Sequence, residues 1–184
     1  MIECPPHSGG ISKGEGKVLR VLRSKKKWAA ATVVVAVIGT LAAVALGQPG
    51  TGFVGQTPLV TAKFNHEVHL NSDRVKFQTK DPTDVRVQQF VIAPGGFSGW
   101  HHHPGIVIVS VASGSVTVWN SDCSSETYGP GLPNGAVFAE GGDDPGQVTN
   151  ASATVGATVY ATFIAPRVDP NPVFRIEDTP ISCP

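Results

Sequence analysis

Hydrophobic and polar residues follow different patterns in the two parts of the chain. Residues 28–46 (WAAATVVVAVIGTLAAVAL) form an apolar run of nineteen residues without a charge. This length is close to the roughly 20 residues that a helix needs to cross ~30 Å of hydrocarbon. We therefore expect a transmembrane or signal-anchor helix over residues 28–47. A buried core helix is the alternative, although a core helix of this length normally carries a polar stripe.

Beyond residue 56 the apolar positions fall into short β-rich runs, and no helical period is visible. Apolar and polar residues alternate in DVRVQ at residues 84–88, as expected for a strand with one solvated face. The run IVIV at residues 106–109 is apolar throughout, so we expect a central strand that is covered on both faces. The expected strands are residues 59–64, 85–93, 106–111, 116–120, 136–140, 147–150 and 154–165.

Turn-forming sequences separate these runs. Glycine, proline, asparagine and aspartate gather at residues 81–82, 94–96, 113–114, 129–131, 133–135 and 144–146. Short strands that alternate with such turns are typical of an all-β sandwich or barrel. The chain thus divides into an N-terminus (1–27), an apolar helix (28–47), a glycine-containing linker (48–56) and a β domain (57–184).

Charge excludes one class of function and orients the chain. The formal net charge is zero and only 15% of residues are charged, so no basic surface favours nucleic acid. Residues 1–47 carry seven Lys/Arg against two acids, whereas residues 48–184 carry seven against twelve. Basic residues directly precede the apolar run, and the positive-inside rule then predicts a cytoplasmic N-terminus with the β domain outside.

The expected location is therefore the cell membrane, with a single pass through residues 28–47. Residues 45–47 (ALG) also have the small-x-small form of a signal-peptidase site. Cleavage after Gly47 would give a secreted protein instead of an anchored one.

Two cysteines, Cys123 and Cys183, lie in the part of the chain that is expected outside the cytoplasm. An oxidising compartment favours their pairing. The bridge would close a loop of about 60 residues and attach the end of the chain to the β domain. Two independent free thiols are the alternative.

Three consecutive histidines, His101, His102 and His103, are the densest cluster of potential ligands. In a strand, residues two apart share a face, so His101 and His103 can reach one ion while His102 points away. Imidazole nitrogens suit transition metals, and two rings need one or two further ligands. A polar turn without a metal is the alternative. His66 and His69 have no fixed common face and are weaker candidates.

The surroundings of these histidines resemble the first motif of the cupin superfamily. Gly95 is followed by five residues, His101, one residue and His103, and Gly114 closes the next strand. The sequence SGWHHHPG at residues 98–105 is similar to the S-G-W-H-x-H-P-G motif of small bacterial cupin-domain proteins.

A second region resembles the second motif of that family. It comprises YGPG at residues 128–131 and the stretch at residues 138–150. The resemblance covers roughly residues 84–165. It implies a double-stranded β-helix, the cupin jelly-roll barrel, with its site inside the mouth of the barrel.

Two of the four ligand positions usual in the family lack a ligand in this chain. Val107 stands where the first motif places a glutamate, and Gly146 where the second places a histidine. Glu140 is the best substitute, since it lies on the strand that leads into the second motif among mostly apolar neighbours. A rim carboxylate that faces solvent is the alternative for Glu140. With ligands lost, we expect His101 and His103 to hold a divalent ion weakly.

Two functions are compatible with these residues, and a purely structural role is a third alternative. The first is a binding module whose barrel mouth accepts a small polar ligand, with Trp100 and His102 as contact residues and a weakly held zinc, iron, manganese or nickel ion. The second, which the family implies, is a metal-dependent enzyme of the dioxygenase or isomerase type, and it needs a tightly held ion. The missing ligands favour the first. The sequence leaves a homodimer open.

Overall fold

The structure is a computed structural model that describes residues 50–183. These residues form ten β-strands joined by turns and loops. The expectation of an all-β domain is confirmed. The strands are β1 (Thr51–Phe64), β2 (His69–Asn71), β3 (Lys76–Gln78), β4 (Thr83–Phe97), β5 (His101–Ser113), β6 (Val116–Asn120), β7 (Ser125–Tyr128), β8 (Val137–Thr149), β9 (Ala157–Pro166) and β10 (Ile176–Glu177).

None of the residues 50–183 belongs to a helix that could span a membrane. The segment expected to do so, residues 28–47, lies outside the described residues, as does the basic N-terminus at residues 1–27.

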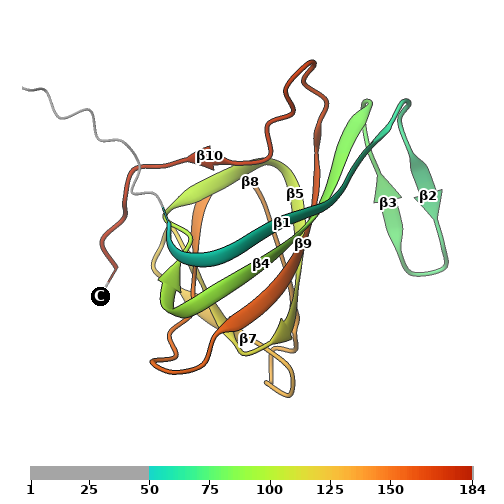
Figure 1. The fold of residues 1–184 in the computed structure, drawn as a ribbon. Coiled ribbons are helices and arrows are strands. Elements are labelled where there is room, and N and C mark those ends of the chain that lie inside the picture. The colour runs from blue at the N-terminus through green and yellow to red at the C-terminus, as the bar shows by residue number, and fades with distance from the viewer. Residues whose placement is uncertain (1–49, 184) are drawn as a thin grey trace, which may run out of the picture. The chain divides into compact units, whose positions relative to one another are not determined.

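The main sheet curves round into a barrel, in the strand order β1-β4-β9-β5-β8-β6-β7 (Figure 1). β10 pairs with the start of β5, and β4 also pairs with β8 through Phe97 and Thr149. The remaining strands, β2 and β3, form a hairpin of their own that projects beside the barrel. Neither this hairpin nor β7 and β10 were expected from the sequence.

The barrel interior is filled by alternate residues of the central strands. On β5, Val107 and Val109 are buried, whereas Ile106 and Ile108 are 55% and 42% exposed. The expectation that this strand is covered on both faces is therefore wrong. β5 is central because β9 and β8 pair with its two edges, but the outer face of its apolar run meets solvent.

The segment expected as a linker is partly a strand. β1 begins at Thr51 and pairs with β4 as far as the register pair Thr51 and Phe97. Gly52 has a φ of 79°, and a Cβ there would lie 2.6 Å from the Cα of Gly96. Glycine at this point thus serves the close approach of two strands rather than flexibility.

An expected turn at residues 144–146 lies within β8, which continues from Val137 to Thr149. The pairing of β8 with β5 shifts register around His103, and Gly142 has a φ of 85°. The turn-forming residues therefore produce an irregularity in one strand instead of ending it.

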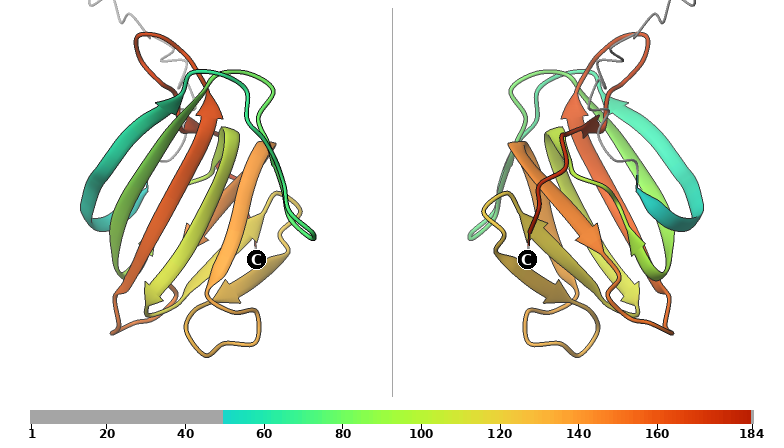
Figure 2. Two further views of the ribbon diagram at one scale, coloured as in Figure 1. Left: turned by 90° about the vertical axis from the view of Figure 1, so that its right-hand side faces the viewer. Right: turned by 90° about the vertical axis from the view of Figure 1, so that its left-hand side faces the viewer.

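The expected disulfide is present. Cys123 and Cys183 are bonded, with their Cα atoms 5.4 Å apart and 60 residues between them in sequence. Cys123 lies in the turn between β6 and β7, so the bond fixes the segment that follows β9. We call residues 167–183 the strap. It carries β10 at one end of the barrel and continues down the side of the barrel (Figure 2).

Candidate metal and ligand site

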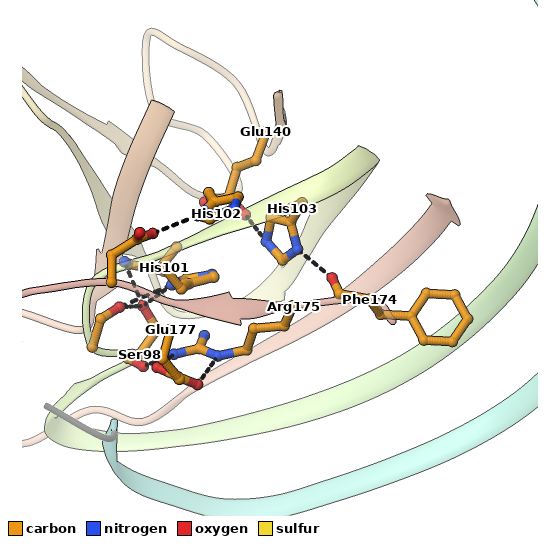
Figure 3. Close-up of polar contacts among 11 residues, drawn as sticks. Ser98, His101, His102, His103, Glu140, Phe174, Arg175 and Glu177 are labelled. Atoms are coloured by element: carbon orange, nitrogen blue, oxygen red, sulfur yellow. Dashed lines mark hydrogen bonds and ion pairs between the residues drawn. The ribbon is translucent and has the colours of Figure 1, made fainter. Parts of the chain in front are cut away.

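The two outer histidines of the triplet point into the barrel. His101 and His103 open β5, each is 5% exposed, and their ring centroids lie 4.8 Å apart with perpendicular planes. His102 faces the other way, and its Nδ1 lies 2.8 Å from Oδ2 of Asp178. The alternation expected for a strand is therefore found here (Figure 3).

Backbone carbonyls hold both inward rings in one orientation. Nδ1 of His101 donates to the Gly99 oxygen at 2.8 Å, and Nδ1 of His103 donates to the Phe174 oxygen at 2.6 Å. Because a carbonyl oxygen only accepts, each Nδ1 carries a proton and each Nε2 is left for a metal.

His101 is an uncharged ligand at neutral pH. Burial lowers the pKa of His101 to about 4, and the positive charge of Arg175 acts in the same direction, against the carboxylate of Glu140. A metal that binds this ring therefore does not have to displace a proton from it.

Glu140 lies on β8, and its side chain contacts His103. Its Oε2 lies 3.4 Å from Nε2 of His103, and its side chain is 14% exposed. Together with His101 these residues offer three ligand atoms that all lie within 4.8 Å of one another. Glu140 thus points at the histidines rather than into solvent.

The other carboxylate oxygen, Oε1 of Glu140, is buried and has no hydrogen-bond partner among the described residues. A buried carboxylate oxygen without a partner is costly. A cation beside it would remove that cost. Two imidazole nitrogens and one carboxylate are also a common donor set for divalent transition metals, so these residues fit such an ion.

The strand register explains how Glu140 reaches this place. Glu140 is the direct partner of Val107, and Gly146 is the partner of His101, in the antiparallel pairing of β8 with β5. Directly opposite residues share a face of the sheet. Glu140 on β8 thus faces the same side of the sheet as Val107, whereas Gly146 offers no side chain.

The strap supplies partners that sequence reasoning missed. The Phe174 carbonyl accepts a hydrogen bond from Nδ1 of His103. Arg175 donates to the Ser98 carbonyl at 2.6 Å and pairs with Glu177 at 2.5 and 2.8 Å. The hydrogen bonds from Arg175 hold the pKa of Glu177 below its usual range. The only sequence signal for this proximity was the disulfide, which brings the strap to the barrel.

Two hollows adjoin the three ligand residues. The larger, of about 450 Å³, is the barrel interior, and the second, of about 390 Å³, lies beside His102, Asp122 and Asp144. The residues that line the larger cavity besides His101, His103 and Glu140 include Phe53, Gln56, Arg86, Gln88, Phe90, Val107, Val109, Phe138, Phe163, Phe174 and Arg175.

The remaining candidates lie elsewhere. Trp100 is 3% exposed and lines a separate hollow with Trp119 and Cys183, not the cavity with the histidines. His66 and His69 are exposed at and before the β2–β3 hairpin. The structure therefore brings His101, His103 and Glu140 together. Trp100, His66 and His69 do not join them.

No protein-family model and no curated protein matches the chain. Matching solved structures include an oxalate oxidase in complex with glycolate (22% identity, 42% of this chain, 40% of that chain, TM-score 0.36). A second is a sugar phosphate isomerase of the cupin superfamily from Silicibacter pomeroyi (23% identity, 42% of this chain, 48% of that chain, TM-score 0.36). A third is a cupin domain from Bordetella pertussis (20% identity, 66% of this chain, 99% of that chain, TM-score 0.40). The first two matches span less than half of those chains.

Proposed function

We propose that the barrel binds a divalent transition metal on His101, His103 and Glu140 and accepts a small ligand in the adjoining cavity. The observation that supports this most directly is the buried, unpartnered Oε1 of Glu140 beside two imidazole nitrogens. When bound, the metal would supply a Lewis acid that polarises an oxygen of the ligand.

The protein's own residues prepare the site before a metal arrives. The carbonyls of Gly99 and Phe174 orient the two rings, so little side-chain entropy is lost on binding. Zinc, iron, manganese and nickel all accept this donor set. Because Gly146 supplies no fourth ligand, we expect a divalent ion that exchanges readily.

A metal-dependent enzyme of the dioxygenase or isomerase type is the second candidate. One observation favours it: three protein ligands leave coordination positions open, and a cavity of about 450 Å³ adjoins them. A binding module needs the same cavity but no turnover. Release of a chemically altered ligand would separate the two.

Export and membrane anchoring through residues 28–47 are part of the proposal. The Cys123–Cys183 disulfide supports an oxidising compartment. A homodimer likewise remains a proposal.

Elemental analysis of the full chain, purified in detergent without chelator, tests the metal site. We expect a transition metal in the unmodified chain and a loss of that metal in His101→Ala and His103→Ala. His102→Ala is the matched control, because His102 lies on the opposite face of β5. Equal losses in all three variants, or no binding of added metal by the unmodified chain, would contradict the proposal.

A further inference from the structure

Arg86 is a cavity residue whose charge has no carboxylate partner among residues 50–183. It projects from β4 into the barrel, and no acidic oxygen among those residues lies within 4.0 Å of its nitrogens. Its Nε donates to Oγ1 of Thr61 at 3.4 Å, and its Cζ lies 4.1 Å from the centre of the Phe174 ring. The two terminal nitrogens of the guanidinium are thus free to donate to a ligand.

None of the other charged residues that line the cavity is paired with Arg86. Arg175 is paired with Glu177, and Glu140 lies beside His103. Asp84, two residues before Arg86 on β4, is buried but does not line the cavity. The guanidinium of Arg86 is therefore unpaired among the described residues, and an anionic group of a ligand would be a suitable partner for it.

Gln88 stands beside this charge. It is 9% exposed, lines the same cavity, and its side-chain amide has no hydrogen-bond partner among the described residues. Because residues two apart on a strand share a face, the guanidinium of Arg86 and the amide of Gln88 project from the same wall. A guanidinium fork with a neighbouring amide donor is complementary to the two oxygens of a carboxylate.

The rest of the cavity wall is apolar and largely aromatic. The Phe90 ring packs against Phe53 and Phe163 with centroids 5.6 and 6.4 Å apart, and Phe163 packs against Phe174 at 5.7 Å. The cavity of about 450 Å³ has the size of a small-molecule site, roughly 300–1,000 Å³. Such walls suit a ligand whose body is flat or branched and apolar.

We propose that the cavity binds a small monocarboxylate with an aromatic or branched apolar body, and that Arg86 and Gln88 hold its carboxylate. Phe174 connects this anchor to the metal site, because its ring lies under Arg86 while its carbonyl accepts a hydrogen bond from His103. The carboxylate anchor rests on the proposed function for its cavity but uses no metal ligand.

Benzoate and benzamide are suitable probes, since they share a ring and a size and differ in charge. We would titrate each calorimetrically into the full chain in a non-ionic detergent, with and without chelator. Benzoate should bind at least tenfold more tightly than benzamide. Arg86→Gln should reduce benzoate binding at least tenfold and leave benzamide binding unchanged, and Gln88→Leu should weaken benzoate binding by a smaller factor.

Arg74→Gln is the matched control, because Arg74 is an exposed arginine on the β2–β3 hairpin. Circular dichroism and metal content of Arg86→Gln check its folding, and Arg86→Lys, which keeps the charge without the fork, should bind benzoate with intermediate affinity. Equal binding of both probes, no binding of either, or benzoate binding that Arg86→Gln and Arg86→Lys leave unchanged would overturn the carboxylate anchor. Benzoate preference in a chain that binds no metal would support the anchor while refuting the metal site.

Discussion

At the scale of single residues, Glu140 is a candidate ligand that a neighbouring strand brings to the two histidines. Glu140 and Val107 are direct partners across β8 and β5. Two such positions in an antiparallel pair present their side chains to the same face, with Cβ atoms about 4.5–5.5 Å apart. A carboxylate can therefore serve one metal site from either strand.

The first prediction concerns the charge of Glu140. Glu140→Gln keeps the shape of the side chain but removes the anionic oxygen, so zinc affinity should fall by more than about 100-fold, since loss of even a ligand's partner costs about 10–100-fold. Competition against a fluorescent chelator measures this. Unchanged affinity would show that Glu140 is not a ligand.

The second prediction moves the carboxylate across the strand pair. Glu140→Val should abolish zinc binding, and the double variant Val107→Glu with Glu140→Val should restore part of it, because position 107 faces the same cavity. The same competition assay compares the two. A double variant that binds no better than Glu140→Val would show that the two positions are not equivalent.

Residue-scale reasoning from the sequence found the inward pair His101 and His103 because the period of a strand determines which side chains share a face. It also singled out Glu140 by its apolar neighbours. It did not find Phe174 or Arg86. Phe174 contacts His103 across 71 residues of sequence, and only the folded structure shows that Arg86 lines the cavity without a paired carboxylate.

At the scale of elements, the strap links the disulfide to the histidines. Its backbone orients His103, its β10 pairs with β5, and its end is bonded to the turn before β7. The order of this segment therefore affects both the stability of the barrel and the geometry of the metal site.

The third prediction tests this link. Cys183→Ser should lower the free energy of unfolding by about 3–4 kcal/mol in the chain-entropy model, and it should also weaken zinc binding because His103 loses a firmly held acceptor. Denaturant unfolding and zinc titration measure the two effects. As a control, a reductant should produce the same changes in the unmodified chain and no further change in Cys183→Ser. Zinc affinity that is insensitive to both would contradict the link.

The fourth prediction concerns the contact of β5 with β9. A Cβ at Gly105 would lie 2.1 Å from the Ile164 carbonyl oxygen, whereas a Cβ at Gly146 would meet the Trp119 oxygen at 3.5 Å. Gly105→Ala should therefore cost about 1–3 kcal/mol of stability or more, and Gly146→Ala much less. Urea unfolding of the two variants provides the comparison, and equal costs would contradict the close approach.

Strand positions were predicted better than strand ends. The alternating and apolar runs indicated the middle of β4, β5, β6 and β9 correctly, because side-chain period is a local property. The ends were wrong where pairing decides the outcome. Gly52 and the glycines of β8 permit close approach and irregularity within strands, although their residue type alone favours turns.

At the scale of the whole molecule, the proposed metal binding would be linked to folding, because the folded barrel brings the three candidate ligand atoms within 4.8 Å of one another. The fifth prediction is that zinc raises the melting temperature of the full chain and that chelator reverses this. At a free zinc concentration about 100 times the Kd, the free energy of unfolding should rise by about 2.7 kcal/mol. Thermal unfolding followed by circular dichroism measures it.

His101→Ala serves as the control for this experiment, because it removes a ligand while leaving Glu140 in place. The variant should melt at the same temperature with and without zinc. An equal zinc-induced rise in both chains would show that the ion acts elsewhere.

The strap also determines when the site comes into existence during folding. Its contacts with the histidine region join residues 71 to 77 positions apart in the chain, so they require the closure of a long loop. β5 and β8 can bring His103 and Glu140 together before the strap arrives. An ion captured at that stage would dissociate quickly, and its dissociation would slow only after the strap has closed. The residence time of a bound metal would thus report closure of the strap over the histidines.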